Sequence, residues 1–114
     1  MSVVLRQWDV VKVRINPEDR DEHPAIILSS DEVAGGRWPK INVIYGTTKR
    51  PTDKLLPGQV LLDEADGCDH LTAFDCVFFP VVRKAAISKK LGSVSANRRR
   101  ILHQTIAGAL RLFQ

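Results

Sequence analysis

Proline and glycine residues divide most of this sequence into short apolar segments, and this spacing limits what the chain can fold into. The dividing residues are Pro17, Gly35, Gly36, Pro51, Pro57 and Gly92. Segments of about four to eight residues between such breaks are typical of strands, whereas a packed helix needs about ten or more. Apolar and polar residues alternate after Val10 and again after Lys40, as in strands buried on one face. The sequence therefore predicts a mainly β fold.

Five or six strands follow from these patterns. They are predicted at 8–15, 24–30, 40–45, 59–62 and 74–82, with a further short one at 85–87. The segment 24–30 is almost continuously apolar, which is typical of a strand buried on both faces. Pro80 interrupts or ends the strand at 74–82, because proline cannot donate a hydrogen bond to its neighbour. The segment 16–23 is predicted to be a loop, since Pro17 and four acidic residues do not suit a packed strand.

The last segment, from about 95 to 112, has the clearest helical pattern. Its predicted buried face consists of Ile101, Leu102, Thr105, Ile106, Ala109, Leu110 and Phe113. Ser93 or Ser95 is expected to cap the N-terminus. Three arginines at 98–100 lie in the first turn, where the helix dipole disfavours positive charge, and this indicates an anionic partner. The predicted architecture is a small curved barrel of five to seven strands with this helix over one opening.

Length and composition limit the remaining choices. The 114 residues predict one domain, 1–114, that is large enough to bury a core without disulfides. Cys68 and Cys76 do not make a disulfide framework, and no apolar stretch suits a signal peptide or a membrane span, so we expect a cytoplasmic protein. The net charge of +4, from 17 basic and 13 acidic residues, is compatible with a polyanionic partner. It is equally compatible with a basic protein that binds no nucleic acid.

Several motifs follow one another along the chain. An acidic residue precedes two valines at 9–11, a polar loop covers 17–22, and the next strand reads His23-Pro24-Ala25-Ile26-Ile27-Leu28-Ser29. A strand ending in two threonines, a proline-containing loop, the strand 59–62 and a closing helix complete the order. Over nearly the full length this order resembles the PemK/MazF toxins of bacterial type II toxin–antitoxin systems. The resemblance implies an SH3-like barrel, usually a homodimer, that cleaves single-stranded RNA without a metal until a cognate antitoxin blocks it.

The resemblance also implies where the site lies. The family usually has an arginine before the proline, acting on the scissile phosphate, and here that residue is His23. Histidine exchanges protons near neutral pH and arginine does not, so His23 is the candidate acid or base. Thr48, or its neighbour Thr47, matches the family's threonine and is expected to donate a hydrogen bond to phosphate. The candidate RNA-binding residues are Arg14, Arg20, Lys49, Arg50 and Asp75.

Each of these assignments has an alternative. His23 is otherwise a solvated residue at a strand start, and the two threonines otherwise only stabilise a turn. Because His23 replaces the family's arginine, a second function stays open: a non-catalytic SH3-like barrel that binds nucleic acid or a protein.

Two further groups of residues are given no part in the site. The aromatic residues Phe74, Phe78 and Phe79 are expected in the core rather than as base-stacking platforms. Cys68, His70 and Cys76 do not have the four-ligand pattern of a zinc site, so no metal and no cofactor is expected.

Overall fold

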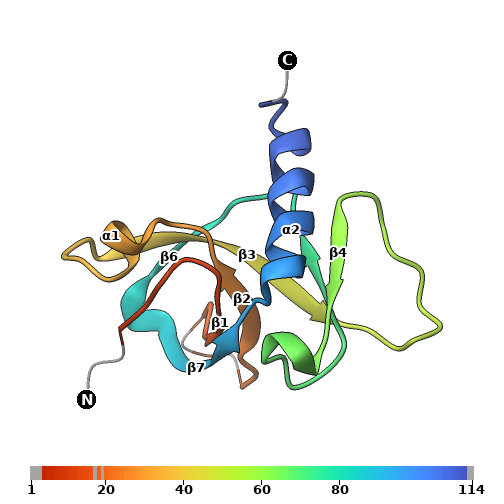
Figure 1. Cartoon of the computed structure of the whole chain (residues 1–114). Helices are drawn as coiled ribbons and strands as arrows, with labels where there is room; N and C mark the ends of the chain where they lie inside the picture. The colour runs from red at the N-terminus through yellow and green to blue at the C-terminus, as the bar shows by residue number, and fades with distance from the viewer. Residues whose placement is uncertain (1–3, 17, 19, 113–114) are drawn as a thin grey trace.

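Seven strands and a C-terminal helix form the framework of the structure, a computed structural model that describes residues 4–16, 18 and 20–112 (Figure 1). The strands are β1 (Asp9–Val13), β2 (His23–Ile27), β3 (Lys40–Thr48), β4 (Gln59–Leu62), β5 (Thr72–Asp75), β6 (Val81–Arg83) and β7 (Ile87–Ser93). The helices are α1 (Asp31–Ala34) and α2 (Ala96–Ala109), with 3₁₀ turns η1 (Glu64–Asp66) and η2 (Lys84–Ala86).

The strands form an antiparallel sheet in which β3 has the central place. The strand order is β4-β5-β3-β2-β1-β7, and β6 pairs with β3 outside this path. Three sections of β3 pair with three different strands: 40–42 with β6, 43–45 with β2 and 46–48 with β5. Because β3 changes partners along its length, the sheet curves around it, and Figure 1 shows β3 crossing most of the molecule.

The sheet curves but does not close into the predicted barrel. Within 4–16, 18 and 20–112, no strand pairing joins the edge strands β4 and β7. The turn after η1 lies against β7 instead, so closely that a Cβ atom on Gly67 would be 2.7 Å from the Cα of Gly92. Arg98 of α2 donates a hydrogen bond to the carbonyl of Leu61 in β4 at 2.8 Å. The mainly β class, the strand number and the final helix are confirmed, and the closure is not.

Apolar residues are buried on both faces of the sheet, because successive side chains of each strand point to opposite sides. One cluster lies on the side of α2 and includes Val10, Ile26, Ile44, Phe74 and Leu102. The other lies on the side of α1 and includes Val11, Val13, Ala25, Ile27 and Val43. Both clusters draw on β2, which confirms the expectation that this apolar run is buried on both faces.

The part of the chain from 72 to 93 departs most from the sequence prediction. The strand expected at 74–82 is two strands, β5 and β6, with a loop between them. Phe74 is fully buried, but Phe78 in this loop is 71% exposed, so its assignment to the core was wrong. The short strand expected at 85–87 is mostly the turn η2, and the real strand β7 follows it and includes Gly92. Only Ile87 and Leu91 of β7 pack against the core, which leaves little apolar periodicity to read.

The helix α2 stands away from the sheet over much of its length (Figure 1). Leu102 and Ala107 are its buried residues, whereas Ile101 and Leu110 are 47% and 49% exposed. The predicted buried face is therefore only partly covered in this chain, and Phe113 lies outside the described residues. Ser95 occupies the N-cap position but makes no side-chain capping bond, so the expected cap is only partly confirmed.

The start of α2 is held by the buried carboxylate of Asp66. Its Oδ1 accepts the backbone N–H of Ser95 at 2.9 Å, and its Oδ2 lies 3.5 Å from Arg98 Nη1. Arg98 also reaches Asp63 at 3.2 Å. Arg99 donates to the carbonyl of Val94 at 2.7 Å. Two of the three arginines in the first turn thus have intramolecular partners, which offset the unfavourable helix dipole.

Removal of the Asp66 carboxylate should destabilise the fold. Asp66→Ala leaves the Ser95 N–H and part of the Arg98 guanidinium without acceptors, at a cost of about 2–4 kcal/mol in the free energy of unfolding. Urea denaturation followed by circular dichroism measures this. Asp53→Ala, at an exposed pair with Arg50, is the matched control and should cost less than about 1 kcal/mol. Equal effects of the two substitutions would contradict the role given to Asp66.

Both cysteines are expected to be unreactive in the folded protein. Burial raises the pKa of Cys68 to about 11, with smaller contributions from Asp66 and Asp63. Burial likewise raises the pKa of Cys76 to about 11, with a contribution from Asp75. Because the thiolate is the nucleophile, little of it is present at pH 8. A colorimetric disulfide reagent should therefore react with neither thiol in the native protein and with both thiols in guanidinium chloride. Fast labelling of the native protein would contradict this prediction.

Candidate functional site

A cavity of about 700 Å³ lies where the β1–β2 loop, the end of β3 and the middle of β7 meet. His23 contributes from the first position of β2, and Thr47 and Thr48 from the end of β3. Arg20 contributes from the loop, Lys12 from β1 and Lys89 from β7. The two most specific elements of the sequence prediction, the histidine and the threonines, are thus brought together with three cations.

The strand register separates the two threonines. Ala25 of β2 pairs with Tyr45 of β3, so continuing the same register by two residues sets His23 opposite Thr47. Side chains of directly opposed residues lie on one face of a sheet. Thr48 belongs to the other face, where it pairs with the buried residue Thr72. Thr47 is therefore the threonine that shares a face with His23.

The end of β3 approaches β5 closely because Gly46 has no side chain. A Cβ atom there would lie 2.5 Å from Thr72 Cγ2 and 2.8 Å from Phe74 Cε1. A larger residue would push β3 away from β5 and move Thr47 with it. The glycine before the threonines is thus part of how this edge of the cavity is built.

Acids balance the charges around the cavity. Its lining contains the three cations named above and two acids, Asp21 and Glu22. Lys12 Nζ also lies 2.9 Å from Asp69 Oδ2. The hydrogen bond and charge of Lys12 hold the pKa of Asp69 below its usual value, and the charge of Lys89 contributes. An incoming phosphate would therefore compete with Asp69 for Lys12.

Glu22 fixes the loop that carries the histidine. Ser88 of β7 donates a short hydrogen bond to its Oε2, and Arg14 Nη2 lies 3.4 Å from its Oε1. Ser88 also bonds the carbonyl of Lys12 at 3.3 Å. Because Glu22 directly precedes His23, these contacts tie the backbone at His23 to β7 and limit where its ring can go.

Four of the predicted RNA-binding residues do not line this cavity. Arg14 is engaged with Glu22 and lines another cavity, of about 600 Å³. Arg50 is paired with Asp53 at 3.6 Å on the following loop. The backbone N–H of Lys49 donates to the carbonyl of Leu71 at 2.8 Å. Asp75 lines a third cavity, while Arg20 alone of this predicted group is beside His23.

Lys12 and Lys89 were missed at the sequence level. Lys12 occupies a polar position of an alternating strand, which is the usual place of a solvated lysine. Lys89 lies on β7, a strand that the pattern did not predict, and it approaches His23 only through the pairing of β7 with β1. The sequence held no local signal for either residue.

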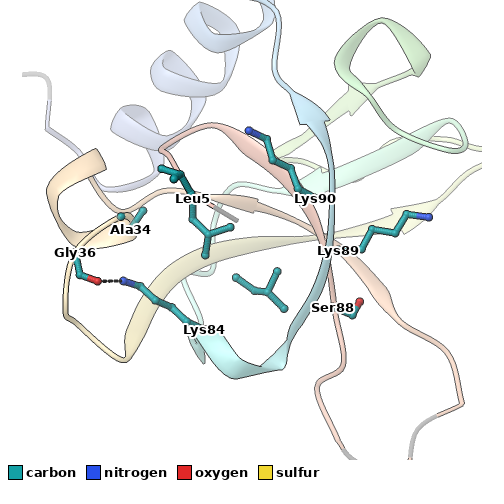
Figure 2. A pocket seen from close by; sticks show the side chains of 10 residues that line it. Leu5, Ala34, Gly36, Lys84, Ser88, Lys89 and Lys90 are labelled. Carbon is teal, nitrogen blue, oxygen red and sulfur yellow. Dashed lines mark hydrogen bonds between the residues drawn. The ribbon is translucent and has the colours of Figure 1, made fainter. Parts of the chain in front are cut away.

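A further basic cavity, of about 450 Å³, has two of its three lysines engaged within the fold (Figure 2). Lys84 Nζ donates to the carbonyls of Val33 and Gly36, at 2.6 and 3.0 Å, and so holds the end of α1. Lys90 Nζ lies 3.3 Å from the buried carboxylate of Asp9. Figure 2 shows Lys89 and Lys90 pointing in different directions from β7, and Lys89 also lines the 700 Å³ cavity that contains His23. Because these lysines stabilise the fold, this cavity is a weaker candidate for the functional site than the 700 Å³ cavity.

The described part of the chain has neither a metal-binding cluster nor a membrane-spanning helix. Across 4–16, 18 and 20–112, no group of three or more His, Cys, Asp or Glu residues is placed to hold a metal ion. Cys68, His70 and Cys76 are among these residues, and they do not form such a group. Over the same residues, no helix has the length and apolar character needed to cross a membrane.

A curved antiparallel sheet followed by one C-terminal helix defines a class of small, mainly β proteins. A sequence model of PemK-like, MazF-like toxins of type II toxin–antitoxin systems matches residues 6–110. The chain belongs to this family. A search of curated protein sequences gave no match.

Solved structures share the fold at low sequence identity. An endoribonuclease in complex with its cognate antitoxin, from a mycobacterial species, matches with a TM-score of 0.79 and 16% identity, covering 96% of this chain and 98% of that one. The Mycobacterium tuberculosis toxin MazF-mt6 matches with a TM-score of 0.75 and 18% identity, covering 93% and 99%. At these identities the likeness establishes the fold.

Release of Lys12 should strengthen anion binding in the cavity. Asp69→Asn removes the competing carboxylate, and the affinity for a short single-stranded oligonucleotide should rise by about 1.5- to 5-fold, the range of an exposed ion pair. Fluorescence anisotropy at low salt measures this. Asp53→Asn removes an acid of a different loop and is the matched control; an equal gain there would mean that net charge alone is responsible.

Proposed function

We propose that this chain is the toxin of a type II toxin–antitoxin system, an endoribonuclease that cleaves single-stranded RNA without a metal ion. Family membership supports the toxin role, and RNA cleavage is typical of the family. The observation that carries the proposal is the cavity in which His23 and Thr47 meet the cations Lys12, Arg20 and Lys89. A proton-exchanging group, a hydroxyl donor and several cations are what phosphodiester cleavage requires.

The proposed reaction uses the RNA's own 2′-hydroxyl. The 2′-oxygen attacks the adjacent phosphorus, its proton passes to a base, and the bond from phosphorus to the 5′-oxygen breaks as that oxygen takes up a proton. A 2′,3′-cyclic phosphate and a 5′-hydroxyl end result. His23 exchanges one of these protons, Thr47 donates a hydrogen bond to a non-bridging oxygen, and the lysines offset the charge that develops on phosphorus.

The fixed position of His23 favours such a role. A proton-transferring group must lie within hydrogen-bond reach of the reacting atom in a reproducible orientation. Glu22, held by Ser88 and Arg14, limits the backbone immediately before the histidine. Lys49, Arg50 and Arg14 are proposed to contact RNA beyond the reacting phosphate, since they lie around the cavity rather than in it.

Substitution of the two central residues tests the proposal. In purified protein with EDTA, His23→Ala should lower the rate of RNA cleavage by about 10²- to 10⁴-fold, the usual contribution of a general acid or base. Thr47→Ala should lower it by about 10- to 10³-fold, as removal of a donor to a developing oxyanion does. Thr48→Ala, which also lines the cavity but from the other face of β3, should lose less activity than Thr47→Ala. Thr105→Ala on α2, a threonine outside the cavity lining, is the matched control and should remain within about threefold of wild type.

Expression in a bacterial host gives an independent readout of the same proposal. Induction of wild type should arrest growth and fragment total RNA, and induction of His23→Ala should do neither. Wild type that leaves varied RNAs intact would contradict the endoribonuclease proposal. A larger loss for Thr48→Ala than for Thr47→Ala would contradict the assignment made from the register.

The same proposal extends to partners and setting. We propose a homodimer of one domain, 1–114, that acts in the cytoplasm and is inhibited by a cognate antitoxin. Exposed apolar residues on α2, with Leu112 beyond it at 68% exposure, support an interface with another chain. One structural relative is described as being in complex with its cognate antitoxin, which supports an antitoxin here.

A non-catalytic binding protein is the second candidate function. His23 stands where the family usually has arginine, and this replacement favours it. Wild-type protein separates the two: an enzyme should cut RNA oligonucleotides, whereas a non-catalytic protein should bind them and leave them uncut. His23→Arg, which restores the family's usual cation, should keep phosphate binding in both cases.

A further inference from the structure

We propose that the cavity of about 460 Å³ that Asp75 lines, beside the His23–Thr47 site, binds one base of the RNA and prefers guanine. It is lined by Tyr45, Asp75, Phe78, Phe79 and Pro80. This inference rests on the proposed cleavage of RNA and adds to it a determinant of where the strand is cut. Its argument comes from the register of the sheet, the exposure of Phe78 and the hydrogen bonds of Asp75.

The sheet register places this cavity next to the proposed reaction site. Thr47 pairs with Ala73, and Asp75 lies two residues further along β5. Tyr45 likewise lies two residues from Thr47 on β3. Tyr45 and Asp75 therefore form a second cross-strand row on the face that carries His23 and Thr47. The two rows are about 7 Å apart, at about 3.3 Å per residue. This separation suits a phosphate in one site and the base of a neighbouring nucleotide in the other.

Phe78 offers an open aromatic surface in this cavity. It is 71% exposed, which is unusual for phenylalanine in a chain with a well-filled core. A base stacked on such a ring gains about 1–3 kcal/mol, whatever its identity. Tyr45 also lines the cavity and is partly buried. The cavity can therefore offer aromatic surface to a base.

The loop that carries Phe78 is held at both ends. The N–H of Cys76 donates to the carbonyl of Gly58 at 2.9 Å, and the N–H of Val43 donates to the carbonyl of Pro80 at 3.0 Å. Asn42 Nδ2 also donates to the carbonyl of Phe79 at 3.2 Å. A platform fixed in this way loses little conformational entropy when a base binds.

Asp75 supplies the discrimination between bases. Gln59 Nε2 donates to its Oδ1 at 3.0 Å, and Gln59 Oε1 in turn accepts the N–H of Leu56 at 2.9 Å. The carboxylate is thus oriented, and an ionised carboxylate only accepts hydrogen bonds. Guanine presents two adjacent donors on its Watson–Crick edge, N1–H and the N2 amino group. Uracil presents one donor between two carbonyl oxygens, which the carboxylate would repel.

Positive charge near the cavity compensates for Asp75. Tyr45 also lines the 600 Å³ cavity, whose rim includes Arg14 and Arg83. Because Tyr45 is common to both cavities, a strand that places a base at Asp75 is proposed to extend toward these cations, which would offset the charge of the acid. An arginine of a protein partner would present a similar pair of N–H donors and would also stack on the ring. A base is the proposed occupant because the cavity lies next to the proposed site of RNA cleavage, and the measurements below distinguish it from a protein partner.

Two measurements on full-length protein test the inference. In the first, wild type, Asp75→Asn and Phe78→Ala are incubated with an RNA library of random sequence, and the cut sites are sequenced. We expect guanine to be enriched at one position beside the cut in wild type, and this enrichment to be lost in Asp75→Asn. Phe78→Ala should lower kcat/KM by about 5- to 100-fold, mainly through KM, and Phe78→Trp should restore it. Trp38→Ala, an aromatic 63% exposed before β3, is the control and should change neither quantity.

In the second measurement, binding is followed without cleavage, using 2′-deoxy tetranucleotides that differ in one base. Guanine should bind most tightly to wild type and lose this advantage in Asp75→Asn. If wild type cleaves RNA and the Asp75 and Phe78 variants keep its base preference, the inference is overturned and the proposed function stands. Guanine-dependent binding without cleavage would support the inference and overturn the proposed function. A change from dimer to monomer in Phe78→Ala, with base preference intact, would identify the ring as a protein interface and overturn the inference.

Discussion

The pairing of β3 with three successive strands is the constraint on which the rest of the structure depends. Backbone hydrogen bonds to β6, β2 and β5 fix, in turn, the start, middle and end of this strand. Each section of β3 sets the position of a different part of the chain. The same pairing therefore determines both the curvature of the sheet and the position of Thr47 and Thr48 at the end of β3. The proposed chemistry is therefore supported by backbone pairing that extends far beyond the cavity.

The two faces of the sheet have different roles at the end of β3. One face continues into the core through Ile44, Gly46 and Phe74, and this side tolerates no additional volume. The other face carries Thr47 beside the loop that begins β2, and it is open to ligands. Precision on the open side comes from close packing on the closed side, which is how a small protein can hold reacting groups in place without a deep pocket.

Sequence patterns predicted the elements whose burial is regular and missed those whose burial is not. β1 through β4 and α2 were found because apolar residues recur there at strand or helix spacing. β7 was missed because Gly92 and two lysines interrupt its pattern, and α1 because four residues give no periodicity. His23 and Arg20 were predicted with the help of the family resemblance, and both line the cavity. Lys12, Lys89 and the choice of Thr47 over Thr48 depend on which strands pair and in which register, and neither is written in the neighbouring residues.

The contact between Gly67 and Gly92 has a consequence for how such a chain can change over time. Here two stretches of backbone touch where a curved sheet would otherwise meet its own edge, and neither position has room for even a methyl group. The loop before β2 and the loop after β3 contain neither glycine, so they can lengthen, shorten or exchange charges without disturbing that contact. Variation is thereby channelled toward the rim where a strand of nucleic acid would lie, so new target preferences can arise while the architecture beneath them is kept.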